Sequence, residues 1–215
     1  EESFFEKEYM KQETHKQFLS KLKAILPDAV LPIITTDAGF RGPWFQLVRS
    51  FGWEFVGRIR HKTLYQVQNT ESWLPAKSLY KQAKEKPEYL FETSLAKTNP
   101  VTGHLYRKCV KPKNRKRKNL RGKKIQCSVS LKHAKRGREP WLIFTSLSPT
   151  DFNERKIMAI YSTRMQIEES FRDLKNLNNG LSLRHCRSYR KNRLNIALLI
   201  ALIATFSLWI MGLIA

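Results

Sequence analysis

Residues 148–175 read SPTDFNERKIMAIYSTRMQIEESFRDLK, and their pattern predicts one long amphipathic helix. Its apolar side chains recur with a period near 3.6 residues and therefore form a single stripe along the helix. The stripe consists of Ile157, Ile160, Met165, Ile167, Phe171 and Leu174. Ser148 or Thr150 is the expected N-cap, because a side-chain oxygen there can accept a hydrogen bond from the first turn.

Polar residues share this face of the predicted helix. At about 100° per residue, Tyr161, Arg164, Glu168 and Lys175 fall on or beside the apolar stripe, and Glu168 is near its middle. We therefore expect the Glu168 carboxylate to face the core or a cleft, where leaving it unpaired would cost several kcal/mol. Arg164, a metal ion, or both could hold that charge. An ordinary surface pair with Arg164, of about 0.2–0.5 kcal/mol, is the alternative.

The composition points to a polyanionic partner. The 215 residues include 40 Lys and Arg against 18 Asp and Glu, which gives a formal net charge of +22. Nucleic acid is the expected partner, and an anionic membrane is the alternative. The three separated cysteines and the lack of a signal peptide predict a cytoplasmic protein with reduced thiols. Because the chain lacks an initial Met and ends in an apolar segment, we expect it to be a fragment of a longer protein.

An apolar run rich in β-branched residues, at 29–36, predicts a central strand buried on both faces. Asp37 follows directly, and Pro43 suits the first turn of a helix that Gly52 would end. Asp37 therefore lies at the carboxyl end of a strand, the edge at which open α/β sheets bind ligands. A capping or turn role is the alternative for this residue.

The remaining chain predicts an α/β protein in three parts. Residues 1–60 form the first part of the core, beginning with a helix over 1–26 and ending in a strand over 53–60. Residues 61–139 form a β-rich insertion, and residues 140–215 the second part of the core. The expected pieces of the insertion are strands at 64–68, 89–93, 104–110 and 125–131 and a small helix at 73–84.

The chain also contains two basic segments and one long apolar segment. In Lys111–Lys124, nine of fourteen residues are Lys or Arg, and Leu183–Arg193 is also basic, so both are expected to contact phosphates. Leu194–Ala215 carries no charge and is long enough to span a bilayer, but a buried core helix is the preferred interpretation.

The spacing Tyr161-x-x-Arg164-x-x-x-Glu168-x-x-x-x-x-x-Lys175 resembles the signature of bacterial insertion-sequence DDE transposases, in the Tyr-Arg-Glu-Lys subgroup. The segment 36–40, TDAGF, looks like the second catalytic Asp of that family on its strand. The resemblance runs from about Leu31 to the end of the chain, and is nearest to transposases of composite antibiotic-resistance transposons.

The resemblance implies a ribonuclease-H-like mixed sheet flanked by helices. It implies a DNA transposase that cuts and joins phosphodiesters at insertion-sequence ends with two Mg²⁺ or Mn²⁺ ions. Asp37 and Glu168 would be catalytic metal ligands. The implied DNA-binding residues are Tyr161, Arg164, Lys175, Trp141, Arg58 and Arg60, with Trp141 stacking on a flipped base. Double-stranded DNA, as transposon ends and target, is the implied partner, and a homodimer in a synaptic complex is expected.

Two departures from the family pattern stand out. Nothing before Asp37 can serve as the first catalytic Asp, so that residue is expected upstream of Glu1, and the fragment alone is expected to be inactive. Met165 replaces a Trp that some relatives use to support the flipped base. Two other function classes stay open: a non-catalytic basic remnant that binds nucleic acid, and a membrane protein anchored by residues 194–215, which is the less expected of the two.

Overall fold

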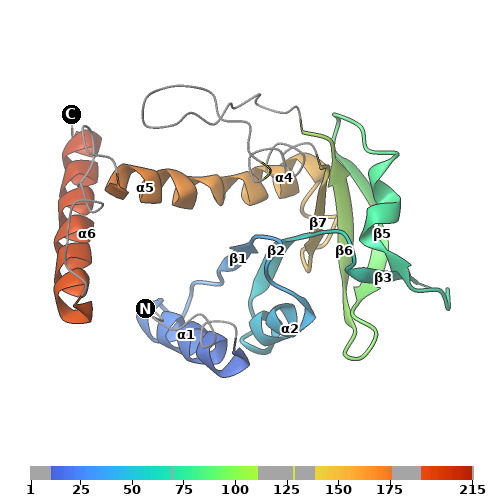
Figure 1. Cartoon of the computed structure of the whole chain (residues 1–215), viewed down its shortest axis with the longest axis horizontal. Helices are drawn as coiled ribbons and strands as arrows, with labels where there is room; N and C mark the ends of the chain where they lie inside the picture. The colour runs from blue at the N-terminus through green and yellow to red at the C-terminus, as the bar shows by residue number, and fades with distance from the viewer. Residues whose placement is uncertain (1–10, 69, 111–127, 129–138, 176–189, 215) are drawn as a thin grey trace. The chain divides into compact units, whose positions relative to one another are not determined.

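The computed structural model describes residues 11–68, 70–110, 128, 139–175 and 190–214 (Figure 1). The chain divides into two compact units, Glu1–Ser162 and Thr163–Ala215. The first unit contains a seven-stranded mixed sheet, and the described part of the second contains two helices, α5 (Met165–Lys175) and α6 (Lys191–Ile214).

The strands of the first unit form one sheet in the order β1-β2-β7-β6-β5-β3-β4. Strands β1 and β2 are parallel, and all other neighbours are antiparallel. The strands are β1 (Ile33–Thr36), β2 (Glu54–Ile59), β3 (Leu64–Val67), β4 (Leu74–Pro75), β5 (Glu88–Leu95), β6 (Val101–Lys108) and β7 (Trp141–Thr145). A mixed sheet flanked by helices is compatible with the expected ribonuclease-H-like fold.

Helices α1 (Gln12–Ile25) and α2 (Gly42–Ser50) cover one face of the sheet (Figure 1). Phe45 of α2 stacks on Phe55 with a centroid distance of 4.5 Å, and both rings contact Phe144. Gly57 makes this packing possible, because a Cβ there would lie 2.5 Å from the Phe45 ring. Gly52 ends α2 with a φ of +77°, which confirms its expected role.

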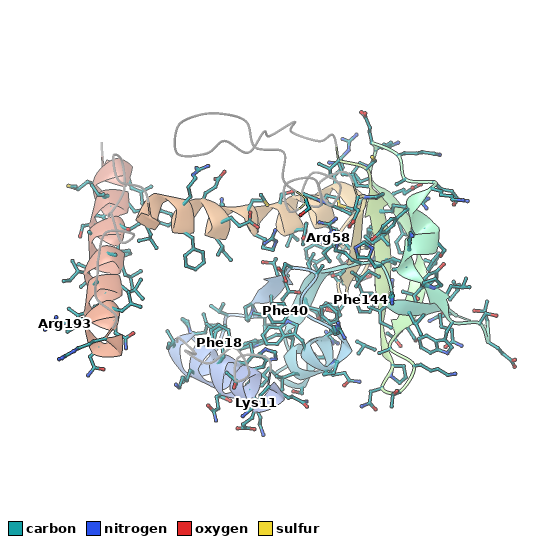
Figure 2. The ribbon with its side chains drawn as sticks, viewed as in Figure 1. Lys11, Phe18, Phe40, Arg58, Phe144 and Arg193 are labelled. Carbon is teal, nitrogen blue, oxygen red and sulfur yellow. The ribbon has the colours of Figure 1, made fainter. Side chains whose placement is uncertain are left out.

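Helix α4 (Glu154–Thr163) covers the opposite face. Its residues Ile157 and Tyr161 are buried against Val56, Tyr106 and Ile143 of the sheet. Arg58 and Phe144, on neighbouring strands, therefore point to opposite faces (Figure 2).

The single helix predicted over 148–175 is wrong in two respects. The stretch forms α4 and a separate α5 (Met165–Lys175), with a turn at Arg164 between them. The N-cap is Asn153, whose Oδ1 accepts the Lys156 amide at 3.0 Å, and not Ser148 or Thr150. Ser148 instead closes a turn, because its carbonyl accepts the amides of Asp151 and Phe152.

The strand predicted to end at Thr36 is present, but among the described residues it is not central. Ile33 packs against one core and Ile34 against the other, so both faces of β1 are covered. However, among the described residues β1 pairs only with β2 and lies at the edge of the sheet. Apolar residues on both sides of a strand indicate that both of its faces are covered. They do not indicate how many strands pair with it in the sheet.

Strands β3 to β6 belong to the same sheet as β1 and β2. The small helix expected over 73–84 is the shorter 3₁₀ helix η1 (Ala76–Tyr80). The expected strand at 125–131, apart from residue 128, and the basic run 111–124 lie outside the described residues, as does most of 183–193. Of the helix expected over 1–26, residues 1–10 also lie outside, and α1 accounts for the rest.

The second unit contains α5 and α6 (Lys191–Ile214). Large apolar side chains along α6 are exposed, from 42% for Ile210 to 86% for Leu213, so the expected burial of a core helix is not observed. A helix that is apolar on all sides is normally buried, in a protein core or in a membrane. Within the described residues α6 alone is long and apolar enough to cross a membrane.

Candidate functional site

Arg58 lies near the carboxyl end of β2, on the face of the sheet that α4 covers. Its Nη2 donates to the backbone carbonyls of Glu139 and Pro140, at 3.3 Å each. Burial lowers the pKa of Arg58 from its usual value, and Tyr161 is the strongest of the groups that raise it. Its Nε is buried and has no hydrogen-bond partner within the described part of the chain. Two hydrogen bonds therefore fix the position of the Arg58 guanidinium group, and within the described structure its Nε–H remains available as a donor.

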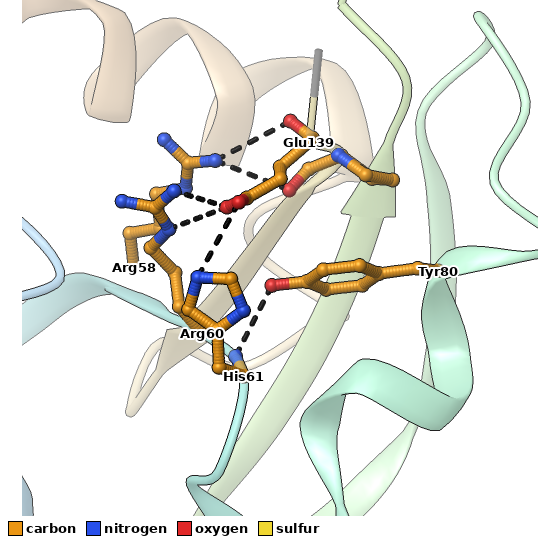
Figure 3. A network of polar contacts seen from close by, with 6 residues as sticks. Arg58, Arg60, His61, Tyr80 and Glu139 are labelled. Atoms are coloured by element: carbon orange, nitrogen blue, oxygen red, sulfur yellow. Dashed lines mark hydrogen bonds and ion pairs between the residues drawn. The ribbon is translucent and has the colours of Figure 1, made fainter. Parts of the chain in front are cut away.

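Arg60, two residues further on, forms an ion pair with the carboxylate of Glu139 (Figure 3). Both Nε, at 2.7 Å, and Nη2 of Arg60 donate to Glu139 Oε2. The other oxygen, Oε1, lies 3.3 Å from Nε2 of His61. The Arg60 and Glu139 side chains are only 20% and 14% exposed, so water screens this pair little.

The backbone of His61 is fixed in an unusual conformation. Its φ of +49° lies in the left-handed region, which is uncommon for a residue with a side chain. The His61 amide donates to the Tyr80 hydroxyl at 3.1 Å, and the His61 carbonyl accepts the Lys77 amide at 3.1 Å. These two bonds hold the turn that directs the imidazole toward Glu139 (Figure 3).

Trp141 and Tyr161 form an aromatic pair beside Arg58. Their ring centroids are 4.9 Å apart and the planes meet at 77°, an edge-to-face contact. Tyr161 is 2% exposed, whereas Trp141 is half-buried. Since Trp141 is the first residue of β7 and Glu139 and Pro140 precede it, the pair adjoins the arginine network directly. This contact sets the plane of the exposed part of the indole.

Asp37 is exposed and follows the last residue of β1. Its Oδ1 accepts the Gly39 amide at 2.8 Å, which is the turn role considered as an alternative. Thr36 pairs with Gly57, so Asp37 lies at the same end of the sheet as Arg58. A turn role fixes one carboxylate oxygen and leaves the group open to solvent.

Glu168 belongs to the second unit, on α5. Arg164 Nη2 lies 3.0 Å from Glu168 Oε1, which confirms the expected pairing one helical turn apart. The Glu168 side chain is 55% exposed, so within the described structure its carboxylate is not buried in a core. The apolar stripe around it is uncovered as well, since Ile167 and Phe171 are 53% and 54% exposed. Lys175 ends α5, and its side chain lies outside the described part.

The structure thus brings together four of the predicted DNA-binding residues, Arg58, Arg60, Trp141 and Tyr161, and separately pairs Arg164 with Glu168. Asp37 and Glu168 belong to different units. Among the described residues, no group of three or more His, Cys, Asp or Glu side chains could hold a metal ion.

Sequence reasoning missed Glu139 and its contact with His61. The available signal was that Glu139 is the only acidic residue among residues 93–150, a stretch rich in Lys and Arg.

Chemically, the arginine network and the exposed indole suit a ligand that carries both phosphates and bases. Guanidinium groups bind phosphate with charge-assisted hydrogen bonds. A half-exposed indole offers a face on which a base can stack. The carboxylates of Asp37 and Glu168 are hard oxygen donors of the kind that Mg²⁺ and Mn²⁺ prefer.

One comparison with known proteins gives a match, to a protein family. The family model described as transposase DDE domain matches residues 9–206. No curated protein matches the chain. The matched range includes the sheet, the arginine network and most of the second unit, so the chain belongs to the DDE transposase domain family.

Proposed function

We propose that this protein is the catalytic region of an insertion-sequence DNA transposase of the Tyr-Arg-Glu-Lys subgroup. It cuts DNA phosphodiesters at the element's ends and joins the freed ends to target DNA. The observation that carries the proposal is the cluster of Arg58, Arg60, Trp141 and Tyr161 at the sheet end that also bears Asp37, in a chain of the DDE family with a net charge of +22.

Asp37 and Glu168 are the proposed metal ligands. Both are exposed carboxylates, so neither needs to be uncovered before it meets an ion. Two bound Mg²⁺ or Mn²⁺ ions would stabilise charge on the attacking and leaving oxygens of a phosphodiester. Arg164, 3.0 Å from Glu168, orients that carboxylate on α5 and partly neutralises it before a cation binds.

The family's first catalytic Asp is proposed to lie on a strand upstream of Glu1. Strand β1 offers a place for it, because among the described residues its outer edge has no partner. An unpaired strand edge presents backbone N–H and C=O groups that another strand can bind. Such a strand would bring its own carboxyl end close to Asp37.

The remaining residues are proposed to hold DNA. Arg58 and Arg60 bind backbone phosphates, and Trp141 stacks on an unpaired base while Tyr161 supports the indole from its edge. Lys175 and Tyr161 contact phosphates near the cut, and residues 61–139 act as a β-rich insertion within the catalytic core. The transposase works in the cytoplasm as a homodimer that holds two DNA ends.

The test is metal-dependent cleavage of element-end DNA by the intact transposase, in Asp37→Asn and Glu168→Gln variants. Each should lose cleavage by about 1,000-fold or more while DNA affinity changes little, because each keeps its shape and loses only a ligand charge. Glu169→Gln and Asp28→Asn are matched controls, since they remove a neighbouring exposed carboxylate and should cleave normally.

Cleavage that survives in both Asp37→Asn and Glu168→Gln contradicts the proposal. DNA binding without any metal-dependent cleavage by the unmodified transposase supports the alternative, a basic nucleic-acid-binding remnant.

A further inference from the structure

We propose that Arg60 and His61 form a binding site for a DNA phosphate, and that the Glu139 carboxylate occupies this site in the free protein. DNA would bind this site by displacing Glu139 from Arg60. The inference rests on the proposed function, because it assumes that DNA approaches this end of the sheet. It adds two residues, Glu139 and His61, and a mechanism by which the free protein keeps one of its cations covered.

Glu139 occupies one edge of the Arg60 guanidinium group. Nε and Nη2 of Arg60 both donate to Glu139. These two nitrogens form one edge of the guanidinium fork, the kind of edge that binds carboxylate or phosphate with two hydrogen bonds. While Glu139 is in place, that edge of Arg60 is unavailable to DNA.

The site around Arg60 already binds an anionic group, the Glu139 carboxylate. His61 Nε2 lies 3.3 Å from the second carboxylate oxygen, so two cationic or potentially cationic side chains converge on one group. The His61 turn, at a φ of +49°, is held by the Tyr80 hydroxyl and the Lys77 amide. A backbone conformation of this kind persists only where its surroundings hold it, and such conformations gather at functional sites.

The position of Glu139 is unusual for an acidic residue in this chain. Glu139 is the only acidic residue among residues 93–150, and 14% exposure makes it a costly place for a charge without a partner. The Arg58 side chain also binds residues 139–140, because it donates hydrogen bonds to the backbone carbonyls of Glu139 and Pro140. Displacing the carboxylate therefore leaves the segment attached, so exchange needs only a side-chain rotation.

The exchange has a measurable electrostatic consequence. In the free protein Arg60 is neutralised by Glu139, so binding one phosphate there releases few counterions. Once Glu139 is neutral, the same contact should add about one phosphate's worth of counterion release to binding. Affinity should then rise most at low salt, and the dependence of log Kd on log salt should become steeper.

The test compares Glu139→Gln with the unmodified chain in binding a short fluorescent DNA duplex of arbitrary sequence. Glutamine keeps the shape and one acceptor oxygen for Arg60. At low salt the variant should bind about three- to tenfold more tightly, and between about 50 and 200 mM salt its slope should be steeper by about one. The matched control is Glu54→Gln, which neutralises the acid paired with Arg49 at the other end of β2. The control should show only a small gain.

A second variant guards against a general charge effect. With Arg60→Gln present, the gain from Glu139→Gln should fall to that of the Glu54→Gln control. Glu139→Gln binding that is unchanged, weaker, or no tighter than the control overturns the inference and leaves the proposed function standing. A Glu139→Gln chain that no longer folds also overturns the inference, because the Arg60–Glu139 ion pair would then be required for the stability of the fold. No binding by the unmodified chain overturns the inference together with the proposed function.

Discussion

Helices α4 and α5 come from one continuous periodic stretch, yet their apolar residues differ in environment. Ile157 of α4 is fully buried between the helix and the sheet, whereas Ile167 of α5, ten residues later, is 53% exposed. The polar residues follow the same division, since Tyr161 is 2% exposed and Glu168 is 55% exposed. An apolar stripe thus identifies a helix and its face, whereas a packing partner has to come from elsewhere in the fold.

The largest expected difference between α4 and α5 is in the stability lost when Ile157 or Ile167 is replaced by Ala. Ile157→Ala should lower the free energy of unfolding by about 2–5 kcal/mol, because it leaves a cavity in a closed core. Ile167→Ala should lower it by less than about 1 kcal/mol, since little contact is lost at an exposed site. Urea denaturation followed by circular dichroism gives both values. Equal losses at the two positions would show that α5 is as well packed as α4.

Gly57 in β2 and Gly212 in α6 also differ in how closely their surroundings are packed. Gly57→Ala should destabilise the chain by about 1–3 kcal/mol, because its Cβ would lie 2.5 Å from the Phe45 ring and 2.9 Å from Thr36 Oγ1. Gly212→Ala in α6 meets nothing within 4 Å and should be neutral or stabilising by up to about 1 kcal/mol, since Ala favours a helix. Thermal unfolding of the two variants is the measurement. A stable Gly57→Ala chain would contradict the tight packing of the first unit.

Tyr106 provides a pH-dependent test of the core under α4. Burial raises the pKa of Tyr106 to about 12, with smaller contributions from Tyr89 and Glu154. The folded state then holds the proton more tightly than the unfolded state, whose pKa is near 10. Its contribution to stability should be complete below pH 10 and lost as the pH rises toward 12. Denaturation at several alkaline pH values checks this, and Tyr106→Phe should remove that part of the loss.

The smallest effect is expected at the exposed ion pair of α5. Glu168→Gln should change the free energy of unfolding by less than about 0.5 kcal/mol, because an i,i+4 pair at an exposed site is worth little. Denaturation of this variant alongside Glu169→Gln provides the measurement. A loss above about 1 kcal/mol would mean that Glu168 holds the fold, and a cleavage defect could no longer be assigned to metal binding.

Local features of the fold were predictable from the sequence. Pro43 and Gly52 bracket α2, and the apolar run before Asp37 is a strand with both faces covered. These follow from backbone restrictions and from the burial of neighbouring side chains, which act over a few residues. The Arg164–Glu168 pair was predictable for the same reason, since helical spacing alone brings the two side chains together.

Features that depend on distant partners were not predictable. The edge position of β1 depends on which strands pair, and no Pro or Gly marks the break between α4 and α5 at Arg164. Glu139 meets Arg60 across 79 residues of sequence, and no local pattern specifies such a contact. The arginines and Trp141 were identified from a family resemblance. Their convergence at one end of the sheet became visible only in the fold.

The most direct measurement for the central claim is cleavage of element-end DNA by the intact transposase carrying Asp37→Asn, Glu168→Gln or both. Ligands of one metal centre act as a unit, so the double variant should be no slower than the slower single variant. Both single variants should already have lost nearly all Mg²⁺- or Mn²⁺-dependent cleavage. Losses that multiply in the double variant, or a single variant that still cleaves, would show that these two carboxylates do not serve one catalytic centre.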